Sequence, residues 1–455
     1  MNLINIINVL KRKVHKFGGM TLSNSFSFKK VVNIIKNKCK NGDIIVVSAF
    51  GNVTNLLFKL VKYYKKNIKL FDYTKIKLVN YYNELISKLF NGNDLNSLKL
   101  MFLEELNFAI KILEKTKNKK LINNIISLGE LWTAKILNNL LLINNLRTLF
   151  IDSRKFLISS FDTYPKIYEI LSKSLLYPLI VNNKYIERFI ITGYISRDIF
   201  GNTVLLGRNG SDYSAVGIAS ILDIKNVIIW KNVSGISNID PKIIKGSKTL
   251  KNISITEANE LSKLSSSILH FRTLESILFK NKNINIEIKY FFNSYKKTCI
   301  KKENVKCKKN IKIITIEKKV TMITVKNYKN KIIRKNLIII FRKYDVPFFI
   351  KLIKQDKKNI SIFCKFNISL ELIKDLNNKR IKIKNKKNMS CISLIGDKIA
   401  NNENNYKIIN NILKEKIIFL INSKSSNSIL IFIKKNYINK ILLKLYKKIF
   451  NNKCI

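Results

Sequence analysis

A lysine and a glycine pair close the first apolar run of the chain, in the stretch VHKFGGMTLSNS at residues 14–25. Glycine accepts a positive φ without steric cost, so a glycine pair after a strand is often only a turn. Such a pair can also bring backbone N–H groups close to a phosphate, with a lysine to neutralise its charge. Lys16, Gly18 and Gly19 alone leave both possibilities open.

Four further segments place polar residues where predicted strands end or helices begin. They are VVSAFGNVTN (46–55), SLGE (127–130), LGRNGSDYSA (206–215) and WKNVSGISNIDPK (230–242). Open α/β sheets bind ligands at the carboxyl ends of their strands. Each candidate also has a plainer role: Ser48 can bond a strand end, and Thr54 or Ser211 can cap a helix. Glu130 and Asp212 can be solvated carboxylates.

The net charge of +56 arises from 75 lysines and 10 arginines against 29 acidic residues. Such an excess ordinarily indicates a nucleic-acid or membrane-surface partner. Readers of bases and phosphates favour arginine for its bidentate fork, however, and the lysines here are spread among many Asn and Ile, all residues of A/T-rich codons. We attribute the charge to mutational bias and expect no nucleic-acid partner. Because arginine is scarce in this chain, we interpret Arg208, which lies between two glycines, as a functional residue.

The glycines indicate where the chemistry lies. Of 14 glycines, 13 occur at or before Gly246, so the glycine-dependent loops belong to the first half. No apolar run approaches the roughly 18 residues that span a bilayer, and the opening MNLINIINVLKRK reverses the charge order of a secretory signal. We expect a cytoplasmic protein without membrane contact. The six cysteines are scattered without C-x-x-C, so we expect no disulfide framework and no metal site.

Elements alternate between strand and helix over the first part of the chain. Strands are predicted at 44–50, 189–196, 226–232 and 284–291, and helices at 80–90 and 104–116. This alternation predicts an α/β fold with a mostly parallel sheet covered on both faces. Beyond residue 312 the order strand, helix, strand, strand, helix occurs twice, which is a ferredoxin-like arrangement. The predicted division is a catalytic domain at 13–291, a linker at 292–312, and repeats at 313–388 and 389–455.

Together these motifs resemble the aspartate kinases. KFGGMT, VSAFGNVTNLL, SLGE, LGRNGSDYSA, the W-x-x-V-x-G-I-x-x-x-D-P block and EANELSKLSSSILHFRT follow the order and spacing of that family. The chain looks most like the kinase half of bifunctional aspartokinase/homoserine dehydrogenases. We expect the dehydrogenase half to be absent, because no G-x-G-x-x-G follows residue 300. The C-terminal repeats are similar to the paired ACT regulatory domains of the family.

The resemblance implies an amino-acid-kinase fold, an αβα sandwich, followed by two ACT-type repeats. It implies transfer of the γ-phosphoryl group of ATP to the side-chain carboxylate of L-aspartate, which gives 4-phospho-L-aspartate for lysine, threonine and methionine biosynthesis. ATP with Mg²⁺ would be the cofactors. The repeats would form a homodimer and could take threonine or lysine as an effector.

The family pattern also assigns roles to residues. It makes Lys16 and Asp212 catalytic. It gives aspartate binding to Ser48, Thr54, Glu130, Arg208 and Ser211, with Arg208 on the α-carboxylate and Glu130 on the α-ammonium. It gives nucleotide binding to Lys16, Gly18, Gly19, Lys231, Asn232, Ser237 and Lys242.

The nucleotide side departs from the family pattern. Met20 stands where a hydroxyl is usual, and Ser267 stands where a lysine is usual. Lys231, Asn232, Ser237 and Lys242 replace Thr, Asp, Tyr and Arg. Loss of one charge-assisted contact costs on the order of 2–4 kcal/mol, or roughly a hundredfold to a thousandfold in rate. We therefore expect a weak but real kinase. The alternatives are an aspartate-binding sensor without turnover and, third, a basic nucleic-acid binder.

Overall fold

The computed structural model describes residues 12–451, apart from residues 65, 116–118, 163, 208, 265–268, 270, 280–281, 303–310, 327–330, 345–348, 352–359, 414–416 and 424. The chain forms two compact units. The first consists of Met1–Ile236 and Glu275–Lys301, and the second of Ser237–Leu274 and Lys302–Ile455. This grouping differs from the predicted division at residue 291, because Ser237–Leu274 packs with the C-terminal repeats.

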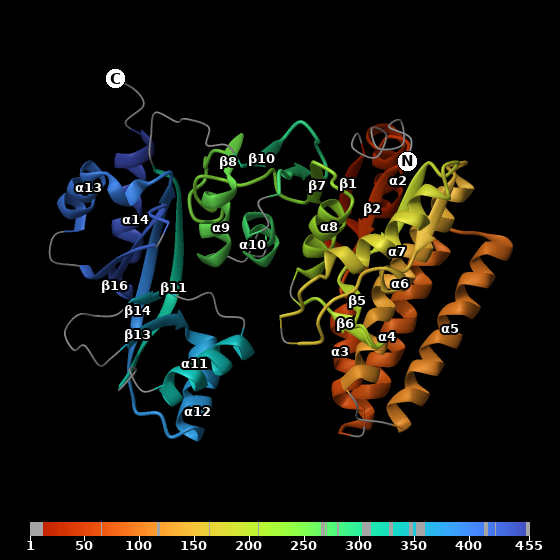
Figure 1. Cartoon of the computed structure of the whole chain (residues 1–455), viewed down its shortest axis with the longest axis horizontal. Coiled ribbons are helices and arrows are strands. Elements are labelled where there is room, and N and C mark those ends of the chain that lie inside the picture. The colour runs from red at the N-terminus through yellow and green to blue at the C-terminus, as the bar shows by residue number, and fades with distance from the viewer. Residues whose placement is uncertain are drawn as a thin grey trace. The chain divides into compact units, whose positions relative to one another are not determined.

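A mostly parallel sheet forms the centre of the first unit, with the strand order β3-β4-β2-β1-β7-β9-β10 (Figure 1). The neighbours from β3 to β9 pair in parallel, and β10 pairs antiparallel to β9. The strands are β1 (Lys13–Phe17), β2 (Asp43–Val47), β3 (Thr148–Ile151), β4 (Arg188–Thr192), β7 (Asn226–Lys231), β9 (Asn285–Tyr290) and β10 (Lys297–Lys301), with a separate hairpin of β5 (Ile195–Arg197) and β6 (Thr203–Leu205).

The predicted strands are present, with two corrections. The run predicted as one strand at 189–196 is two strands, because Gly193 and Tyr194 interrupt it and Tyr194 has a φ of 68°. Part of the segment predicted as a linker at 292–312 is strand β10, whose Thr298 and Ile300 alternate inward. The apolar alternation of that strand is short and flanked by lysines, which hid it in the sequence.

Helices surround this sheet. They are α2 (Ser25–Lys38), α3 (Val53–Tyr63), α4 (Ile68–Ser87), α5 (Gly92–Lys115), α6 (Lys119–Ile143), α7 (Glu169–Val181) and α8 (Gly210–Ile221), with short 3-10 turns η1 (Gly19–Leu22) and η2 (Ser153–Lys155). The predicted helix at 104–116 matches the second half of α5, except for residue 116, which lies outside the described residues. The helix predicted at 80–90 runs across the end of α4, which begins earlier and stops at Ser87. The segment SLGE, predicted to lie where a strand ends or a helix begins, lies instead inside α6.

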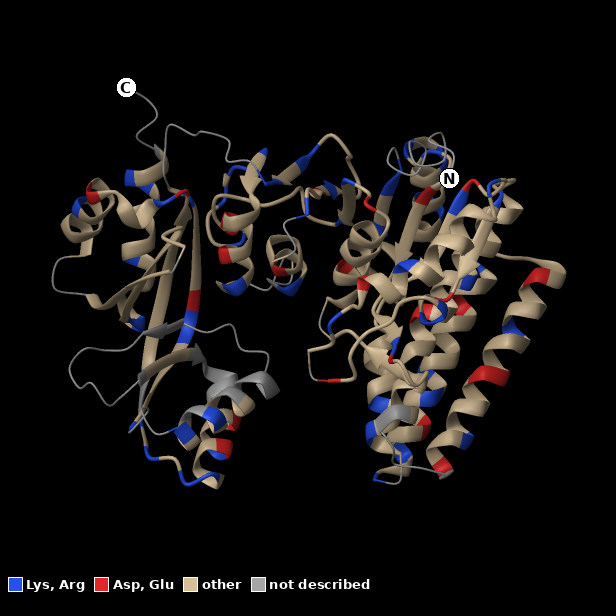
Figure 2. Cartoon of the chain, in the orientation of Figure 1, with Lys and Arg blue, Asp and Glu red and all other residues tan. Residues whose placement is uncertain are grey.

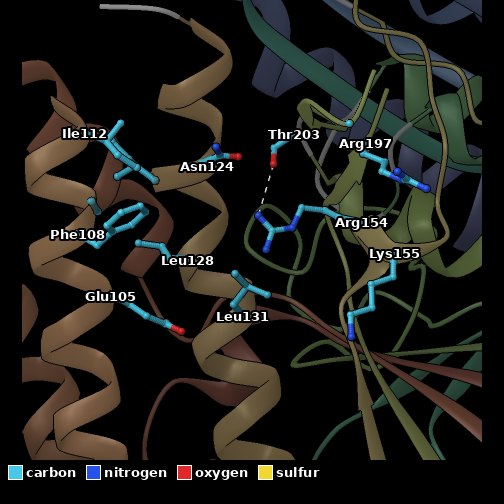
Figure 3. Close-up of a pocket in the computed structure, with 13 residues that line it drawn as sticks. Glu105, Phe108, Ile112, Asn124, Leu128, Leu131, Arg154, Lys155, Arg197 and Thr203 are labelled. Atoms are coloured by element: carbon cyan, nitrogen blue, oxygen red, sulfur yellow. Dashed lines mark hydrogen bonds between the residues drawn. The ribbon is translucent and has the colours of Figure 1, made fainter. Parts of the chain in front are cut away.

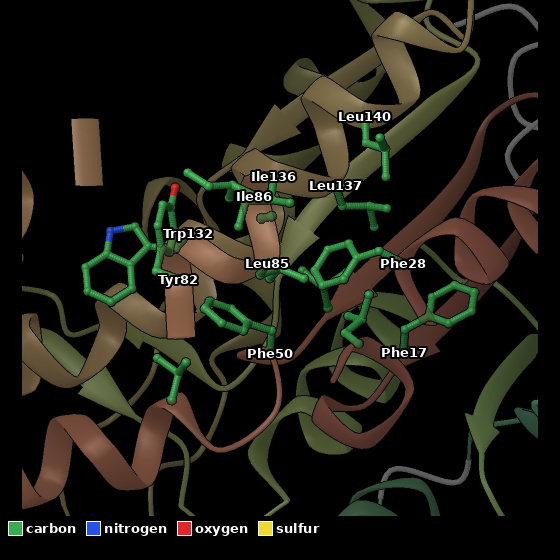
Figure 4. Packing of buried hydrophobic residues seen from close by; sticks show 14 of the residues in the cluster. Phe17, Phe28, Phe50, Tyr82, Leu85, Ile86, Trp132, Ile136, Leu137 and Leu140 are labelled. Carbon is green, nitrogen blue, oxygen red and sulfur yellow. The ribbon is translucent and has the colours of Figure 1, made fainter. Parts of the chain in front are cut away.

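Side-chain alternation along the strands separates the two faces of the sheet. Phe17 of β1 and Trp230 of β7 stack at 5.8 Å on the face covered by α2 to α6. Tyr82, Phe102 and Trp132 pack together in the same cluster, which Figure 4 shows from close by. Helix α8 contacts β1 and β7. Helix α8 lies on the opposite face of the sheet. Side chains alternate between the two faces, so the residue next to Phe17 in β1 points toward α8.

The second unit contains two copies of a strand, helix, strand, strand, helix order, as predicted. The first copy is β11 (Ile311–Val325), α11 (Lys331–Tyr344), β12 (Phe349–Lys351), β13 (Ile360–Lys365) and α12 (Phe366–Asn378). The second is β14 (Ile383–Gly396), α13 (Glu403–Leu413), β15 (Ile417–Asn422), β16 (Ser428–Lys434) and α14 (Ile438–Tyr446). Their common sheet has the order β12-β13-β11-β14-β16-β15. The first strands of the two copies, β11 and β14, therefore pair with each other at the centre, and the two copies share one antiparallel sheet.

The segment Ser237–Leu274 supplies β8 (Asn252–Ser254) and α9 (Ile255–Leu264) to this unit, and α10 (Phe271–Phe279) follows. Lys312 Nζ lies 2.9 Å from the buried Glu257 Oε1. Glu260 of the same helix accepts hydrogen bonds from Ser425 at 3.1 Å and Ser428 at 3.0 Å. Buried charge-assisted contacts therefore tie α9 to the repeats, which explains why it groups with them.

The basic residues are distributed over the elements of both units (Figure 2). This distribution agrees with the even spread of lysine along the sequence. Within the described residues, no helix combines the length and apolar character needed to cross a membrane.

A buried polar cluster joins the starts of β1 and β2. His15 Nε2 lies 3.2 Å from Asp43 Oδ2, and Trp230 Nε1 lies 3.4 Å from His15 Nδ1. An indole N–H can only donate, so we assign the His15 proton to Nε2, which donates to Asp43. The Cys39 thiol completes a group whose potential ligand atoms lie within 4.8 Å of one another. Sequence spacing did not reveal this group. Burial raises the pKa of the Cys39 thiol and disfavours a metal-binding thiolate, so we interpret the cluster as a hydrogen-bonded support of the sheet.

The pH dependence of stability tests this interpretation. Burial lowers the pKa of His15 below its usual 6.5, although Asp43 opposes the shift. The neutral ring therefore stabilises the fold above about pH 6.5, and this contribution is lost progressively over the pH interval below that value. We expect the free energy of unfolding, measured in urea, to decrease over that interval, and His15→Asn to flatten the decrease. His270→Asn removes the only other histidine and serves as the control. Equal pH dependence in all three proteins would contradict the assignment.

Candidate functional site

The carboxyl ends of β1, β2, β4 and β7 meet at one edge of the sheet, because these strands are parallel neighbours. This edge carries Lys16 near the end of β1, Ser48 after β2 and Lys231 at the end of β7. Lys16 pairs in register with Ile229, two positions before Lys231. Both lysines therefore project toward α8.

Asp212 in the first turn of α8 lies between the two lysines. Lys16 Nζ is 2.6 Å from Asp212 Oδ1, and Lys231 Nζ is 3.2 Å from Asp212 Oδ2. The carboxylate is fully buried, and the side chains of Lys16 and Lys231 are only 8% and 19% exposed. The structure thus brings together two residues predicted to be catalytic and one predicted to bind nucleotide.

The trio sets two lysines against one carboxylate. Burial would raise the pKa of Asp212, but the attraction of Lys16 and Lys231 outweighs it, so the pKa is lowered and the carboxylate is ionised. Burial lowers the pKa of Lys16, and repulsion from Lys231 adds to this effect against the attraction of Asp212. A buried charge is costly unless it is paired. Two ammonium groups on one carboxylate therefore form a site that an anion would stabilise.

The glycine pair lies directly beside this trio. The N–H of Gly51 donates to Gly19 O at 3.1 Å, and a Cβ on Gly19 would lie 2.7 Å from Ala49 O. Glycine is therefore required at position 19 by close backbone approach. Thr21 Oγ1 donates to Gly18 O at 2.8 Å and fixes the turn, whereas the Met20 side chain is 66% exposed. The segment that contains Gly18 and Gly19 is thus a tight turn next to a cationic site.

Glu130 approaches the same edge from α6. It is only 2% exposed, and Ala49 N donates to its Oε1 at 3.3 Å. Its Oε2 is buried, and the described residues offer it no hydrogen-bond donor. Burial raises the pKa of Glu130 to about 8, although the Ala49 N–H opposes the shift. A buried carboxyl group with an unused oxygen is suited to receive a cationic ligand group.

Other predicted ligand residues lie along this edge. Ser48 N donates to Phe17 O at 3.1 Å, and Thr54 lies in the first turn of α3. Both side chains are half-buried, and neither has a hydrogen-bond partner among the described residues. Ser211 is buried in the first turn of α8, next to Asp212. In the described structure, none of these three side chains forms a hydrogen bond at a strand end or caps a helix.

Tyr194 is a candidate that sequence reasoning missed. It lies in the left-handed region with φ 68°, and a Cβ on Gly210 would lie 2.9 Å from its ring. Burial raises the pKa of its hydroxyl, and the charge of Glu130 adds to the effect, so the two groups are neighbours. A non-glycine residue in this backbone region often marks a functional site. The only sequence signal was the interruption of a predicted strand at Gly193.

Arg208 and Ser267 lie outside the described residues. Asn232 follows β7 and is exposed. Ser237 and Lys242 belong to the second unit, so their nucleotide role stays a prediction.

The chain is similar to several known proteins. A model of the amino acid kinase family matches residues 11–289. Bifunctional aspartokinase/homoserine dehydrogenase 2 of Escherichia coli (strain K12) is 32% identical over 61% of this chain and 34% of its own length. Bifunctional aspartokinase/homoserine dehydrogenase of Buchnera aphidicola subsp. Acyrthosiphon pisum (strain APS) is 28% identical over 97% of this chain and 57% of its own length. The chain thus spans less than two thirds of the length of either curated relative.

A solved structure shows the same fold over nearly the whole chain. The structure of E. coli aspartokinase III in complex with aspartate and ADP (R-state) matches with a TM-score of 0.79 and 19% identity, and the match covers 97% of this chain and 100% of the other. At this identity the likeness establishes the fold, with the sandwich and the paired repeats in one chain.

The buried carboxyl of Glu130 predicts a measurable stability effect. Its pKa is about 8 in the folded protein against 4.5 for an ordinary glutamate. Between these values the unfolded chain is ionised and the folded chain is protonated, so the stability contributed by this group falls as the pH rises. We expect Glu130→Gln to gain free energy of unfolding relative to the unaltered protein as the pH is raised from about 5 to about 8. Chemical denaturation at several pH values measures this difference.

Glu84→Gln provides the matched control, since the Glu84 side chain is 66% exposed. This control should keep the pH dependence of the unaltered protein. If Glu130→Gln kept it as well, the burial of an unpaired carboxyl would be contradicted.

Proposed function

The chain belongs to the amino acid kinase family, and from this premise we propose that it is an aspartate kinase acting in amino-acid biosynthesis. It would transfer the γ-phosphoryl group of ATP to the side-chain carboxylate of L-aspartate. The observation that carries the proposal is the buried trio of Lys16, Asp212 and Lys231 beside the Gly18-Gly19 turn, with Glu130 at the same sheet edge. This edge offers a cationic grip for phosphate and a carboxyl group for an ammonium.

Phosphoryl transfer depends on positioning and on charge neutralisation more than on covalent help from the protein. An oxygen of the aspartate side chain attacks the γ-phosphorus, the bond to the bridging oxygen breaks, and ADP leaves with that oxygen. Lys16 would neutralise the charge on the transferred group, and the turn at Gly18 and Gly19 would offer backbone N–H groups. Asp212 holds Lys16 in place without itself touching the phosphoryl group.

Lys231 would share the phosphate charge with Lys16. Both ammonium groups face the same carboxylate, so removing either one would leave the trio neutral and weaken its attraction for an anion. We propose that Lys231 compensates for the lysine replaced by Ser267. Asn232, Ser237 and Lys242 remain proposed nucleotide contacts.

The aspartate side would use the groups around Glu130. Its unused oxygen would take the α-ammonium of the substrate, which supplies the positive charge that the buried carboxyl lacks. Arg208 is proposed to hold the α-carboxylate as a bidentate fork, and Ser48, Thr54 and Ser211 are proposed to bond the substrate oxygens. The solved relative with this fold, aspartokinase III, is a complex with aspartate and ADP, which supports the proposed pair of substrates.

Mg²⁺ is the expected companion of ATP, usually held by one or two carboxylates and the phosphates. Asp212 fits this role poorly, because both its oxygens face lysines. We therefore derive no step through the ion and assign it to the phosphates of ATP. We further propose a cytoplasmic location.

For the second unit we propose a regulatory role. Its two repeats match the order of ACT domains, and we propose that they form a homodimer and take threonine or lysine as effector. Lysine is present with aspartate in a solved structure of aspartokinase III, which matches this fold with a TM-score of 0.78. We also retain 13–291 as the proposed catalytic domain, since the family match covers nearly the same residues.

A turnover assay tests the function. Trapping of the acyl phosphate as hydroxamate should require both ATP and aspartate, and Lys16→Ala should lower the rate by roughly a hundredfold to a thousandfold. Lys77→Ala removes an exposed lysine of α4 and should leave the rate unchanged. Runs with added threonine or lysine test the effector. Aspartate binding in calorimetry without any hydroxamate would instead favour a sensor, and equal rates for Lys16→Ala and the control would overturn the proposal.

A further inference from the structure

A cavity of about 680 Å³ lies in the first unit, among α5, α6, the turn after β3 and the β5–β6 hairpin (Figure 3). Its volume is in the range of small-molecule sites. The residues that carry its chemistry are Glu105, Phe108, Leu128, Arg154, Lys155 and Arg197. None of them was assigned to the kinase reaction.

The cavity is separate from the proposed active site although both use α6. Successive side chains of a helix are about 100° apart, so Leu131, Asn124 and Leu128 lie about 100°, 120° and 160° around the axis from Glu130. These three residues line the cavity, whereas Glu130 faces Ala49. The two sites therefore occupy different sides of one helix.

The charged groups of the cavity are unevenly paired. Arg154 binds Asp152 through Nε and Nη2 and donates to Ser127 and Thr203 at 3.3 and 3.4 Å, so its guanidinium is fully engaged. Glu105 accepts from Trp132 Nε1 at 2.7 Å and forms an ion pair with Lys135. The carboxylate and this arginine therefore belong to the walls of the cavity.

Arg197 and Lys155, in contrast, form no ion pair with a carboxylate of the described residues. Arg197 Nε is shielded from solvent, and no described residue accepts a hydrogen bond from it. The described structure also gives the Lys155 ammonium no carboxylate partner. Both side chains line the cavity, so they bring to it two positive charges that no carboxylate of the described residues neutralises. An anionic ligand group would pair with them.

The opposite wall is apolar. Phe108 and Ile112 of α5 and Leu128 of α6 lie together on the side of the cavity away from Arg197 and Lys155 (Figure 3). The Phe108 side chain is 66% exposed, so part of this apolar wall is open to water. An apolar ligand body on this wall would remove that surface from water.

We propose that this cavity binds a small organic anion with an apolar body, such as an aromatic or long aliphatic carboxylate or sulfonate. Its anionic group would lie between Arg197 and Lys155, and its apolar body would cover Phe108 and Leu128. Inorganic anions lack the apolar body, and neutral aromatics lack the charge, so neither would bind as well. The proposal is independent of the kinase reaction, because it uses no residue assigned to that site.

Fluorescence titration tests this site with the full chain. The probe is 8-anilinonaphthalene-1-sulfonate, and N-phenyl-1-naphthylamine, which lacks the sulfonate, is the uncharged reference. We expect saturable binding of the sulfonate at one site, and at least a tenfold higher Kd in Arg197→Gln and in Lys155→Gln. The Kd of the uncharged reference should be the same in all proteins.

Arg147→Gln is the matched control, because Arg147 is an exposed arginine of the same unit whose side chain is 66% accessible. This variant should bind the sulfonate like the unaltered protein. Circular dichroism checks that each variant is folded, and Lys155→Gln, at an exposed position, keeps the test valid if Arg197→Gln does not fold. Equal sulfonate Kd values in the Lys155 variant and the control would overturn the proposal, since the binding would then be nonspecific.

Discussion

The arrangement of the first unit depends on the buried carboxylate of Asp212, which two lysines approach from different strands. Lys16 and Lys231 can meet it only because β1 and β7 are parallel neighbours in a register that points both side chains toward α8. The start of α8 must in turn lie at the carboxyl edge of the sheet. One ion-paired carboxylate therefore links the topology of the sheet, the position of the helix and the excess positive charge that suits a phosphate.

At Glu130, a group suited to bind a ligand lowers the stability of the folded protein. Its burial without a cationic partner raises its pKa to about 8, which costs folding free energy in the unliganded protein at neutral pH. A ligand ammonium would remove that cost. In contrast, the buried cluster of His15, Asp43 and Trp230 satisfies its own hydrogen bonds and supports the sheet without needing a ligand.

The sequence alone predicted the alternating sheet, the doubled repeat and the place of Lys16 and Asp212, because periodicity and ordered motifs are local signals. It failed for the start of α6, because SLGE was placed before that helix; Gly129 lies inside α6 and permits its close packing, as a Cβ there would lie 2.9 Å from the Ala49 side chain. The meeting of Lys231 with Asp212 and the cavity at Arg197 depend on tertiary packing. No spacing in the chain could reveal either of them.

The most direct measurement for the central claim is the affinity for ATP of Lys231→Thr, the residue type usual in the family, compared with that of the unaltered protein by calorimetry at several salt concentrations. If the trio binds phosphate through its excess charge, the variant should bind ATP about tenfold or more weakly, and its affinity should depend less on salt. The same affinity and the same salt dependence in both proteins would contradict the claim.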